Sequence, residues 1–261
     1  MLQNLQSRFA KTGRNVPHLI KKNYSSLAAF YSILMKNIDY SLWAKYLLDI
    51  INKYNLNVQS VLELGGGNGK LAKVLSRKIP NYFLSDKSPF LLEKSKIIKN
   101  RIVCDMIALP FRQDFNFVFA AFDTVNYLTS KKGFADLLSV VSKILKENGS
   151  FTFDVSLEKN SFPHKTGKKK SYNHLDKKII HHSIYNEVSR IHVNEFAFYK
   201  DGKLIEKEIH KQKIFPFEFY LKEIEKSNFY IVDCLEAFGF KRGKSDSKRV
   251  QFILKKVSPN A

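Results

Sequence analysis

The feature that most constrains the fold is a glycine-rich segment, Gly65 to Gly69, that stands between an apolar stretch and an amphipathic one. The apolar stretch, Val61 to Leu64, predicts a short buried strand. After the turn, Leu71, Val74 and Leu75 recur at the spacing of one helix face, so a helix is expected there. Glycine adopts the positive φ angles that such a tight turn demands, and it lets a ligand approach the main chain. The segment therefore predicts a strand, a turn and a helix around a cofactor.

The spacing of the glycines excludes one large class of cofactor. A dinucleotide fingerprint, G-x-G-x-x-G, starting at Gly65 would need glycine at position 70, where Lys70 stands. Two residues before the turn, Glu63 places a carboxylate near its mouth, which repels a pyrophosphate and attracts a cation. The sequence therefore favours a cofactor with an ammonium or sulfonium group over a nicotinamide dinucleotide.

This pattern resembles motif I of the class I S-adenosylmethionine-dependent methyltransferases, and later segments continue the resemblance in the family's order. They are a strand ending at Asp86, the segment around Asp105 and Met106, and Phe122 to Leu128, which is similar to motif IV. The resemblance implies S-adenosylmethionine as cofactor, without a metal, with its ribose on Asp86 and its adenine near Asp105. The cofactor-binding residues expected from it are Glu63, Gly65, Gly66, Gly67, Asn68, Gly69, Asp86, Lys87, Asp105, Met106, Phe122 and Trp43.

Both flanks of this segment extend the resemblance. Phe30 to Met35 and Tyr40 to Trp43 resemble the helical cap of the family's small-molecule branch, which includes sugar and amino-acid N-methyltransferases. Glu208 to Gln212 and the expected helix from Glu218 to Ile224 resemble the same branch. The resemblance implies in-line transfer of a methyl group to a nitrogen or oxygen of a small-molecule acceptor. Tyr31 and Trp43 are equally compatible with plain core aromatics.

Alternating strand and helix patterns between residues 61 and 156 predict an α/β fold, a Rossmann-like doubly wound sheet, and the resemblance implies seven strands with the last antiparallel. Alternation further along predicts an inserted antiparallel sheet over about residues 178–215, with Asp201-Gly202 as a hairpin turn. The basic run from Lys165 to Lys170 is expected in a solvated loop. The expected organisation is a basic extension over 1–23 and a single methyltransferase domain over 24–261, with a cap at 24–54, a core at 61–156, the inserted sheet, and C-terminal helix and strands at 216–256.

The expected catalytic residues are Asn126, Tyr127, His210 and Tyr31, and Asp123 is a further candidate base. Asp123, Asn126 and Tyr127 follow the carboxyl end of a predicted parallel strand, where open α/β sheets bind ligands. His210 shares one polar strand face with Glu206, Glu208 and Gln212. That face fits two interpretations, an ordinary solvent face or a sheet surface over the active-site mouth.

The charge of the chain leaves a second class of acceptor open. With 44 Lys and Arg residues against 24 Asp and Glu, the formal net charge is +20, which suits a methyltransferase acting on RNA. Lysine is spread along the whole chain, however, and no RNA-binding module is recognisable. A small-molecule acceptor is therefore the main expectation, and the alternatives are RNA or a non-catalytic scaffold that binds S-adenosylmethionine.

Targeting and redox signals favour the cytoplasm. No apolar stretch approaches the roughly 18 to 20 residues that span a bilayer, and Cys104 and Cys234 suggest no disulfide framework. Residues 1–38 contain no acidic residue, so a mitochondrial presequence is the minority alternative. His181 and His182 are adjacent on a predicted strand and point to opposite faces, which disfavours a shared metal. Nothing in the sequence predicts the oligomeric state.

Overall fold

The structure is a computed structural model that describes residues 27–36, 38–112, 115–174 and 176–257. The expected basic extension over residues 1–23 lies outside these ranges. The helices and strands are α2 (Leu27–Leu34), α3 (Tyr40–Lys53), β1 (Val61–Leu64), α4 (Lys70–Leu75), β2 (Tyr82–Asp86), α5 (Pro89–Leu92), η2 (Glu93–Ser95), β3 (Asn100–Val103), β4 (Phe115–Ala120), η3 (Thr124–Tyr127), α6 (Lys131–Ile144), β5 (Leu145–Ser156), α7 (Glu158–Ser161), η4 (Phe162–His164), β6 (Lys168–His174), β7 (Lys177–Asn186), β8 (Ile191–Lys200), β9 (Lys203–Lys213), α8 (Phe217–Glu225), β10 (Phe229–Glu236) and β11 (Arg249–Lys256).

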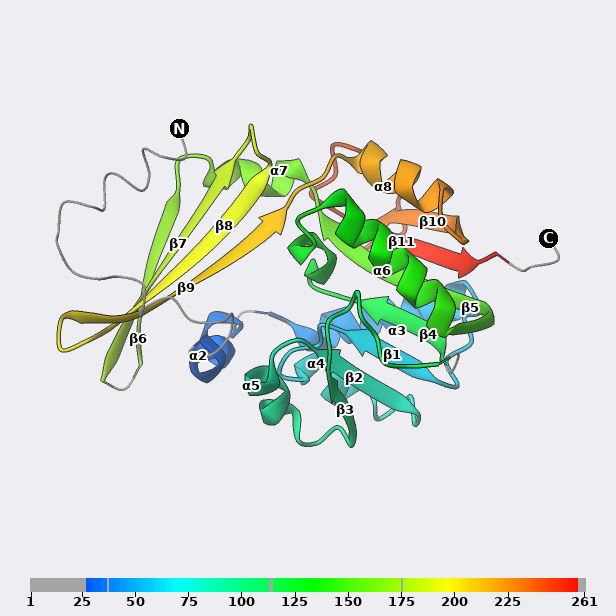
Figure 1. Cartoon of the computed structure of the whole chain (residues 1–261), viewed down its shortest axis with the longest axis horizontal. Helices are drawn as coiled ribbons and strands as arrows, with labels where there is room; N and C mark the ends of the chain where they lie inside the picture. The colour runs from blue at the N-terminus through cyan, green and yellow to red at the C-terminus, as the bar shows by residue number, and fades with distance from the viewer. Residues whose placement is uncertain (1–26, 37, 113–114, 175, 258–261) are drawn as a thin grey trace.

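The main sheet has seven strands in the order β10-β11-β5-β4-β1-β2-β3. β11 runs antiparallel to both of its neighbours, while β1 to β5 pair in parallel. The predicted α/β fold with seven strands and an antiparallel last strand is therefore confirmed. Figure 1 shows α6 and α8 against one face of this sheet.

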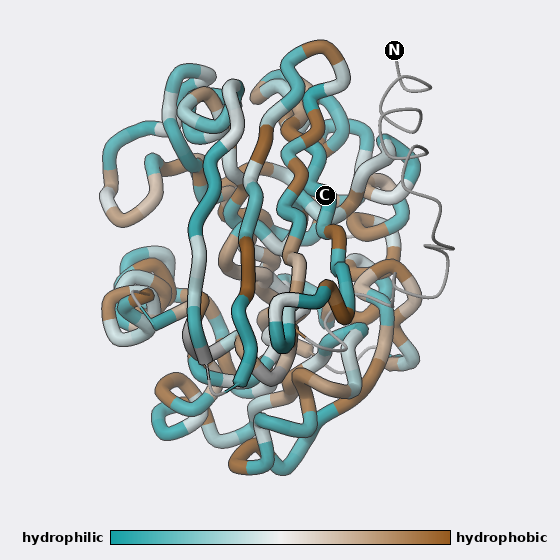
Figure 2. Tube along the Cα trace, turned by 90° about the vertical axis from the view of Figure 1, so that its left-hand side faces the viewer, coloured by the Kyte–Doolittle hydropathy of each residue, from teal (hydrophilic) through white to brown (hydrophobic). Residues whose placement is uncertain are grey.

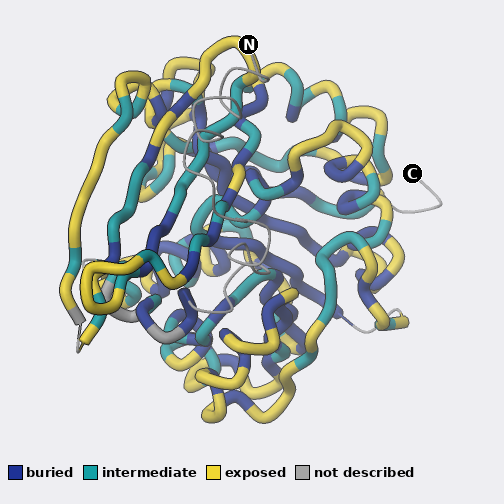
Figure 3. The backbone as a smooth tube through the Cα atoms, turned by 60° about the vertical axis from the view of Figure 1, so that its left-hand side comes forward, coloured by how far each residue is buried: buried dark blue, intermediate teal, exposed yellow. Residues whose placement is uncertain are grey.

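The core of the molecule lies on both faces of the main sheet. β4 is buried along its whole length, as expected for a central strand of an almost parallel sheet covered by helices on both sides. One apolar cluster joins this sheet to α6 and α8, and a second joins it to α3 and α4. Figure 3 shows the buried segments gathered in the middle of the molecule and the exposed ones around its outside.

The inserted sheet has four antiparallel strands in the order β6-β7-β8-β9, and β6 lies before the predicted range of 178–215. Asp201 and Gly202 form the expected hairpin turn, and both have positive φ, 50° and 73°. The prediction of a solvated loop at Lys168 to Lys170 is wrong, because these residues begin β6. β6 is an exposed edge strand, where lysine side chains are common because they discourage pairing with other chains. Figure 2 shows that the strands of this sheet are largely hydrophilic.

The two cap helices attach to different sheets. α3 belongs to the apolar cluster of the main sheet, through residues such as Leu47 and Ile50. α2 packs instead on the inserted sheet in a small separate cluster, in which the rings of Phe30 and Phe198 lie 5.4 Å apart. The cap therefore bridges the two sheets. Among the residues that the structure describes, no helix is long and apolar enough to span a membrane.

The packing predicts a strong dependence of stability on Phe153, whose side chain is fully buried between the rings of Phe134 and Phe252. Phe153→Ala should lower the free energy of unfolding by about 3–5 kcal/mol, because it removes buried apolar surface and leaves a cavity. Denaturant unfolding followed by circular dichroism measures the change. Phe90→Ala, at a ring that is 44% exposed, is the matched control and should change stability by no more than about 0.5 kcal/mol. Equal losses for the two variants would contradict this account of the core.

Candidate active site

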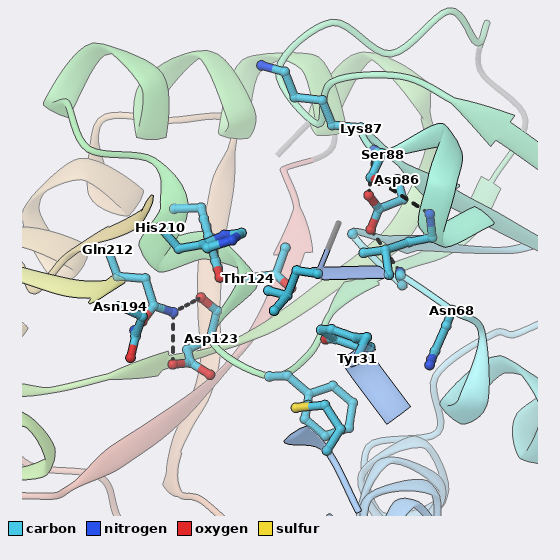
Figure 4. A pocket seen from close by; sticks show the side chains of 18 of the residues that line it. Tyr31, Asn68, Asp86, Lys87, Ser88, Asp123, Thr124, Asn194, His210 and Gln212 are labelled. Carbon is cyan, nitrogen blue, oxygen red and sulfur yellow. Dashed lines mark hydrogen bonds between the residues drawn. The ribbon is translucent and has the colours of Figure 1, made fainter. Parts of the chain in front are cut away.

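A cavity of about 1370 Å³ lies between the main sheet and the inserted sheet. One part of its wall comes from the loops that follow β1 to β4, at the carboxyl edge of the parallel strands. Other parts come from the two cap helices, from the inner face of the inserted sheet, and from Phe238 and Arg249 near the last two strands. Figure 4 shows Asp86, Lys87 and Ser88 on one side, Asp123, Asn194, His210 and Gln212 on the other, and Tyr31 between them in this view. Open α/β sheets bind ligands at this edge.

Ten of the twelve residues expected to bind a cofactor line this cavity, namely Gly65, Gly66, Gly67, Asn68, Asp86, Lys87, Asp105, Met106, Phe122 and Trp43. Glu63 and Gly69 are not among the lining residues. Gly69 precedes α4 with φ 69°, and a Cβ there would lie 2.6 Å from the Cβ of Ser95. Gly69 therefore serves close packing of the turn rather than contact with a ligand.

Gly67 leaves open space at the point where the turn meets the cavity. Its φ of 57° favours glycine, and an added Cβ would stand 3.9 Å from Oδ2 of Asp86 and 4.0 Å from Oη of Tyr31. Any side chain at Gly67 would therefore enter the space between these two polar groups. That space is where a ligand comes against the main chain.

Asp86 is fixed at the end of β2 by two backbone hydrogen bonds. Its Oδ2 accepts from the N–H of Gly67 at 2.8 Å, and its Oδ1 accepts from the N–H of Ser88 at 2.7 Å. Burial raises the pKa of Asp86, and the two hydrogen bonds oppose this shift. Because each carboxylate oxygen keeps a further lone pair, the side chain can still accept hydrogen bonds from a ligand.

Glu63 lies beneath the glycine turn rather than at its mouth. Its side chain is 2% exposed, and Oε2 accepts a hydrogen bond from Oη of Tyr82 at 2.6 Å. Burial raises the pKa of Glu63 to about 7, and the nearby Asp86 adds to the shift while Tyr82 opposes it. Glu63 therefore supports the glycine turn from below and does not line the cavity.

Two consecutive residues after β4 have left-handed backbone conformations, Phe122 with φ 60° and Asp123 with φ 49°. Such conformations cost on the order of 1–3 kcal/mol each and persist only where surrounding contacts hold them. Phe122 packs on Trp43, with 4.4 Å between the ring centroids. The backbone N–H of Asp123 donates to Oδ2 of Asp154 at 2.9 Å. The strained turn presents both Phe122 and Asp123 to the cavity.

Arg249, at the start of β11, connects these groups. Its guanidinium pairs with the carboxylate of Asp154 and, at 3.1 Å, with Oδ1 of Asp123. Burial opposes its charge, but the two carboxylates outweigh burial and raise the pKa of Arg249. Gln212 of β9 donates from Nε2 to Oδ2 of Asp123 at 3.1 Å, as Figure 4 shows. This ion network therefore joins the main sheet to the inserted sheet.

The sequence pattern does not reveal this network. Asp154 is visible as an acid inside an apolar strand, which is a signal of a buried partner. The partner, Arg249, lies 95 residues further along the chain, and nothing local distinguishes it from the other arginines. Gln212 is visible only as one of four polar residues on a strand face.

Three of the four expected catalytic residues, Tyr31, Tyr127 and His210, line the cavity, but Asn126 does not. The side chain of Asn126 is fully buried and holds backbone groups. It donates to the carbonyl oxygens of Lys213 at 2.9 Å and Ser156 at 3.2 Å, and it accepts from the N–H of Ser156 at 2.9 Å. Asn126 therefore joins η3 to β5 and β9, and its geometry supports a positioning role rather than a catalytic one.

The polar face of β9 is buried, so its interpretation as a solvent face is wrong. Glu208 and His210 are at most 1% exposed, and Glu206 and Gln212 are below 10%. Oε1 of Glu208 accepts from the N–H of Leu27 at 2.7 Å and so anchors α2. Its Oε2 lies 3.4 Å from Nε2 of His210. The face supports the cap and contributes His210 and Gln212 to the cavity.

Tyr31 and Tyr127 lie at the junction of the two parts of the cavity. The ring of Tyr127 stands edge-on to His210, with 6.3 Å between centroids. Burial, followed by the nearby Tyr127, raises the pKa of Tyr31 well above its usual value, so its phenol keeps its proton at neutral pH. Tyr31 therefore faces the cavity as a neutral phenol. Within the described ranges no three His, Cys, Asp or Glu side chains cluster as a metal site.

The chain has the fold of the class I S-adenosylmethionine-dependent methyltransferases, which confirms the expected resemblance. An S-adenosylmethionine-dependent methyltransferase from Clostridium acetobutylicum ATCC 824 matches with a TM-score of 0.75 and 19% identity, over 91% of this chain and 100% of that one. The sugar N-methyltransferase KedS8 from Streptoalloteichus sp ATCC 53650 matches with a TM-score of 0.72 and 13% identity, over 88% and 93%.

A relative is also found by sequence, a Geobacillus sp. (strain WCH70) protein named "Putative methyltransferase GWCH70_2453". It is 24% identical over 257 residues, which cover 89% of this chain and 99% of the relative. No family model matches the sequence.

The raised pKa of Glu63 predicts a specific pH dependence of stability. The folded protein holds a proton at Glu63 up to about pH 7, whereas the unfolded chain releases it near pH 4.5. Glu63 therefore makes its full contribution to the free energy of unfolding below about pH 4.5. This contribution declines by about 3 kcal/mol as pH rises toward 7. Glu63→Gln removes this titration, so the difference in unfolding free energy between variant and native protein should change across this window. Exposed Glu147→Gln is the control, and parallel curves for Glu63→Gln and native protein would refute the prediction.

The ion network predicts that Arg249→Met costs about 3–5 kcal/mol of stability at pH 7, because it leaves Asp154 and Asp123 without their buried counter-charge. The loss should be smaller at pH 5, because burial raises the pKa of Asp154 to about 6 and its carboxyl is then largely protonated. Denaturant unfolding at the two pH values measures both effects. The same substitution at exposed Arg101 should be nearly neutral, and a loss below about 1 kcal/mol for Arg249→Met would show that the network does not hold the turn.

Proposed function

We propose that this protein binds S-adenosylmethionine and transfers its methyl group to a nitrogen or oxygen of a small-molecule acceptor, with S-adenosylhomocysteine as the second product. The observation that carries the proposal is the convergence of Gly67, Asp86, Asp105 and Met106 on one end of a single cavity. The other end is formed by the inserted sheet, which presents polar side chains to the cavity. Two ends of different construction suit two different ligands.

The residues at the first end fit the cofactor. Asp86 is a buried carboxylate with lone pairs free for two ribose hydroxyls, and Gly67 leaves room against the main chain. Asp105 and Met106 follow β3 and line the same wall. The carboxylate of Asp86 favours a cationic ligand by its charge. A cavity of about 1370 Å³ also exceeds the roughly 300–1,000 Å³ of typical ligand sites, which leaves space for an acceptor.

The chain's own residues then have to orient the reactants and accept a proton. The bound cofactor supplies a methyl group on a sulfonium that is already activated for displacement, so positioning can provide most of the rate enhancement. The O–H of Tyr31, beside Gly67, is placed to orient polar groups at the junction of the two ends. Phe122 and Trp43 exclude water from the same region.

We assign the role of proton acceptor to His210. Its ring faces Tyr127 in the cavity, and Oε2 of Glu208 lies 3.4 Å from Nε2. A carboxylate at this distance stabilises the imidazolium that forms when His210 takes the proton from the attacking nitrogen or oxygen. Asp123 is less suitable, because Arg249 and Gln212 occupy its carboxylate.

A small-molecule acceptor is supported by the enclosed cavity and by the fold neighbour KedS8, which is described as a sugar N-methyltransferase. RNA is the second candidate acceptor, because a net charge of +20 favours binding of phosphate groups. Purification of the protein distinguishes these two candidate acceptors. Nucleic acid that stays bound until nuclease treatment and a high-salt wash would favour RNA, and its absence would favour a metabolite.

The proposal predicts that isothermal titration calorimetry will detect binding of S-adenosylmethionine and S-adenosylhomocysteine. Asp86→Asn, which keeps the shape of the side chain, should weaken binding by about 100-fold, because it removes a charged acceptor of two hydrogen bonds. Asp136→Asn is the control, since Asp136 pairs only with exposed Lys132 on α6. If native protein bound neither ligand, the methyltransferase proposal would fail and a scaffold role would take its place.

A further inference from the structure

The inserted sheet contributes one formally charged side chain to the described wall of the cavity, that of Lys170. The carboxylates on the main-sheet side are each already partnered. Asp86 accepts two backbone N–H groups, Asp105 pairs with Lys87 at 2.6 Å, and Asp123 pairs with Arg249. Lys170 forms no ion pair with any residue that the structure describes. Glu206 and Glu208 share the inner face of this sheet but are not among the residues that line the cavity, so Lys170 is the cation that the inserted sheet presents to a ligand.

Strand register fixes where this charge lies. Lys170 of β6 stands opposite His181 of β7, His181 opposite Phe196 of β8, and Phe196 opposite Glu208 of β9. Lys170 and Tyr172 line the cavity, whereas Lys169 alternates to the opposite face. β6 lies three strand spacings from β9, about 14 Å at about 4.8 Å each. Lys170 is thus separated from His210 by the length of a small molecule.

The neighbours of Lys170 do not share its charge. Burial lowers the pKa of His181, and the positive charge of Lys170 lowers it further, so this imidazole is neutral at pH 7. Its Nε2 lies 2.8 Å from Oδ1 of Asn194, and its ring stacks on Phe196 at 4.4 Å and 13°. The ring is therefore held in one orientation as a neutral hydrogen-bonding group, and Lys170 provides the cation.

We infer that the methyl acceptor carries an anionic oxygen group, a carboxylate or a phosphate, and that Lys170 binds it at the opposite edge of the inserted sheet from His210. The inference rests on the proposed function, because it takes this end of the cavity to hold the acceptor. An ammonium next to an anionic oxygen forms a charge-assisted hydrogen bond, roughly twice as strong as a neutral one. Among the described lysines of the inserted sheet, Lys170 alone lines the cavity. One lysine suits one anionic group, whereas RNA binding draws on many phosphate contacts.

The test uses three small amines on protein loaded with S-adenosylhomocysteine: 3-aminopropyl phosphate, 4-aminobutyrate and the neutral 3-aminopropanol. Titrations followed by calorimetry or NMR should show that one or both anionic amines bind more tightly than the neutral one. Lys170→Gln should weaken binding of the anionic amines about tenfold and leave 3-aminopropanol unchanged. Lys169→Gln is the matched control on the same strand, and it should bind all three amines as native protein does.

Several outcomes would overturn the inference. The first is equal binding of neutral and anionic amines, and the second is an equal loss in Lys169→Gln, which would indicate general surface charge. The third is absence of binding by both anionic amines at millimolar concentration, and the fourth is binding of a single-stranded RNA oligonucleotide alone. Failure of the proposed function would look different, since native protein would then not bind S-adenosylhomocysteine in the preceding titration. The amines would in that case be tested on unloaded protein, where loss of anion binding in Lys170→Gln alone would support the anion site without the transfer reaction.

Discussion

The ion network of Arg249 with Asp154 and Asp123 is the interaction on which the geometry of the cavity depends. It holds the turn after β4, where two non-glycine residues have left-handed conformations, against β5 and β11. Through Gln212 the same carboxylate of Asp123 also holds β9. Because a strained backbone persists only where its surroundings fix it, this network sets the position of Phe122 and of the inserted sheet together. The two ends of the cavity are thereby kept in register with each other.

Buried carboxylates are concentrated at the carboxyl edge of the main sheet. Glu63, Asp86 and Asp154 each lose hydration, and burial raises the pKa of each. Hydrogen bonds from Tyr82, from the backbone and from Arg249 offset part of this cost. Only Arg249 offers a full positive charge among these partners, and it serves Asp154. Glu63 holds a proton up to about pH 7, so the negative charge at this end comes from Asp86, and a sulfonium ligand would neutralise it.

The first end of the cavity was predictable from sequence because its signals are local. A strand, glycines at fixed spacing and an acid ending the next strand lie within 26 residues, from Val61 to Asp86, and each adopts the expected structure. The hairpin at Asp201-Gly202 is local in the same sense. The second end was not predictable, because it depends on pairing between distant segments. Lys170 and His210 share a face only through the register of four strands, and β6 carries a lysine run that is typical of a loop.

Contacts between distant segments also explain why His210 lines the cavity and Asn126 does not. Both are polar residues at positions where a ligand-binding role is expected, and both are buried. Asn126 meets backbone groups of β5 and β9, because those strands close over η3 and leave its amide no path to the cavity. His210 lines the cavity from β9, edge-on to the rings of Tyr127 and Phe196. The end of the cavity at the glycine turn is therefore held largely by the main chain, whereas the end at the inserted sheet is shaped by side chains that meet only through strand pairing.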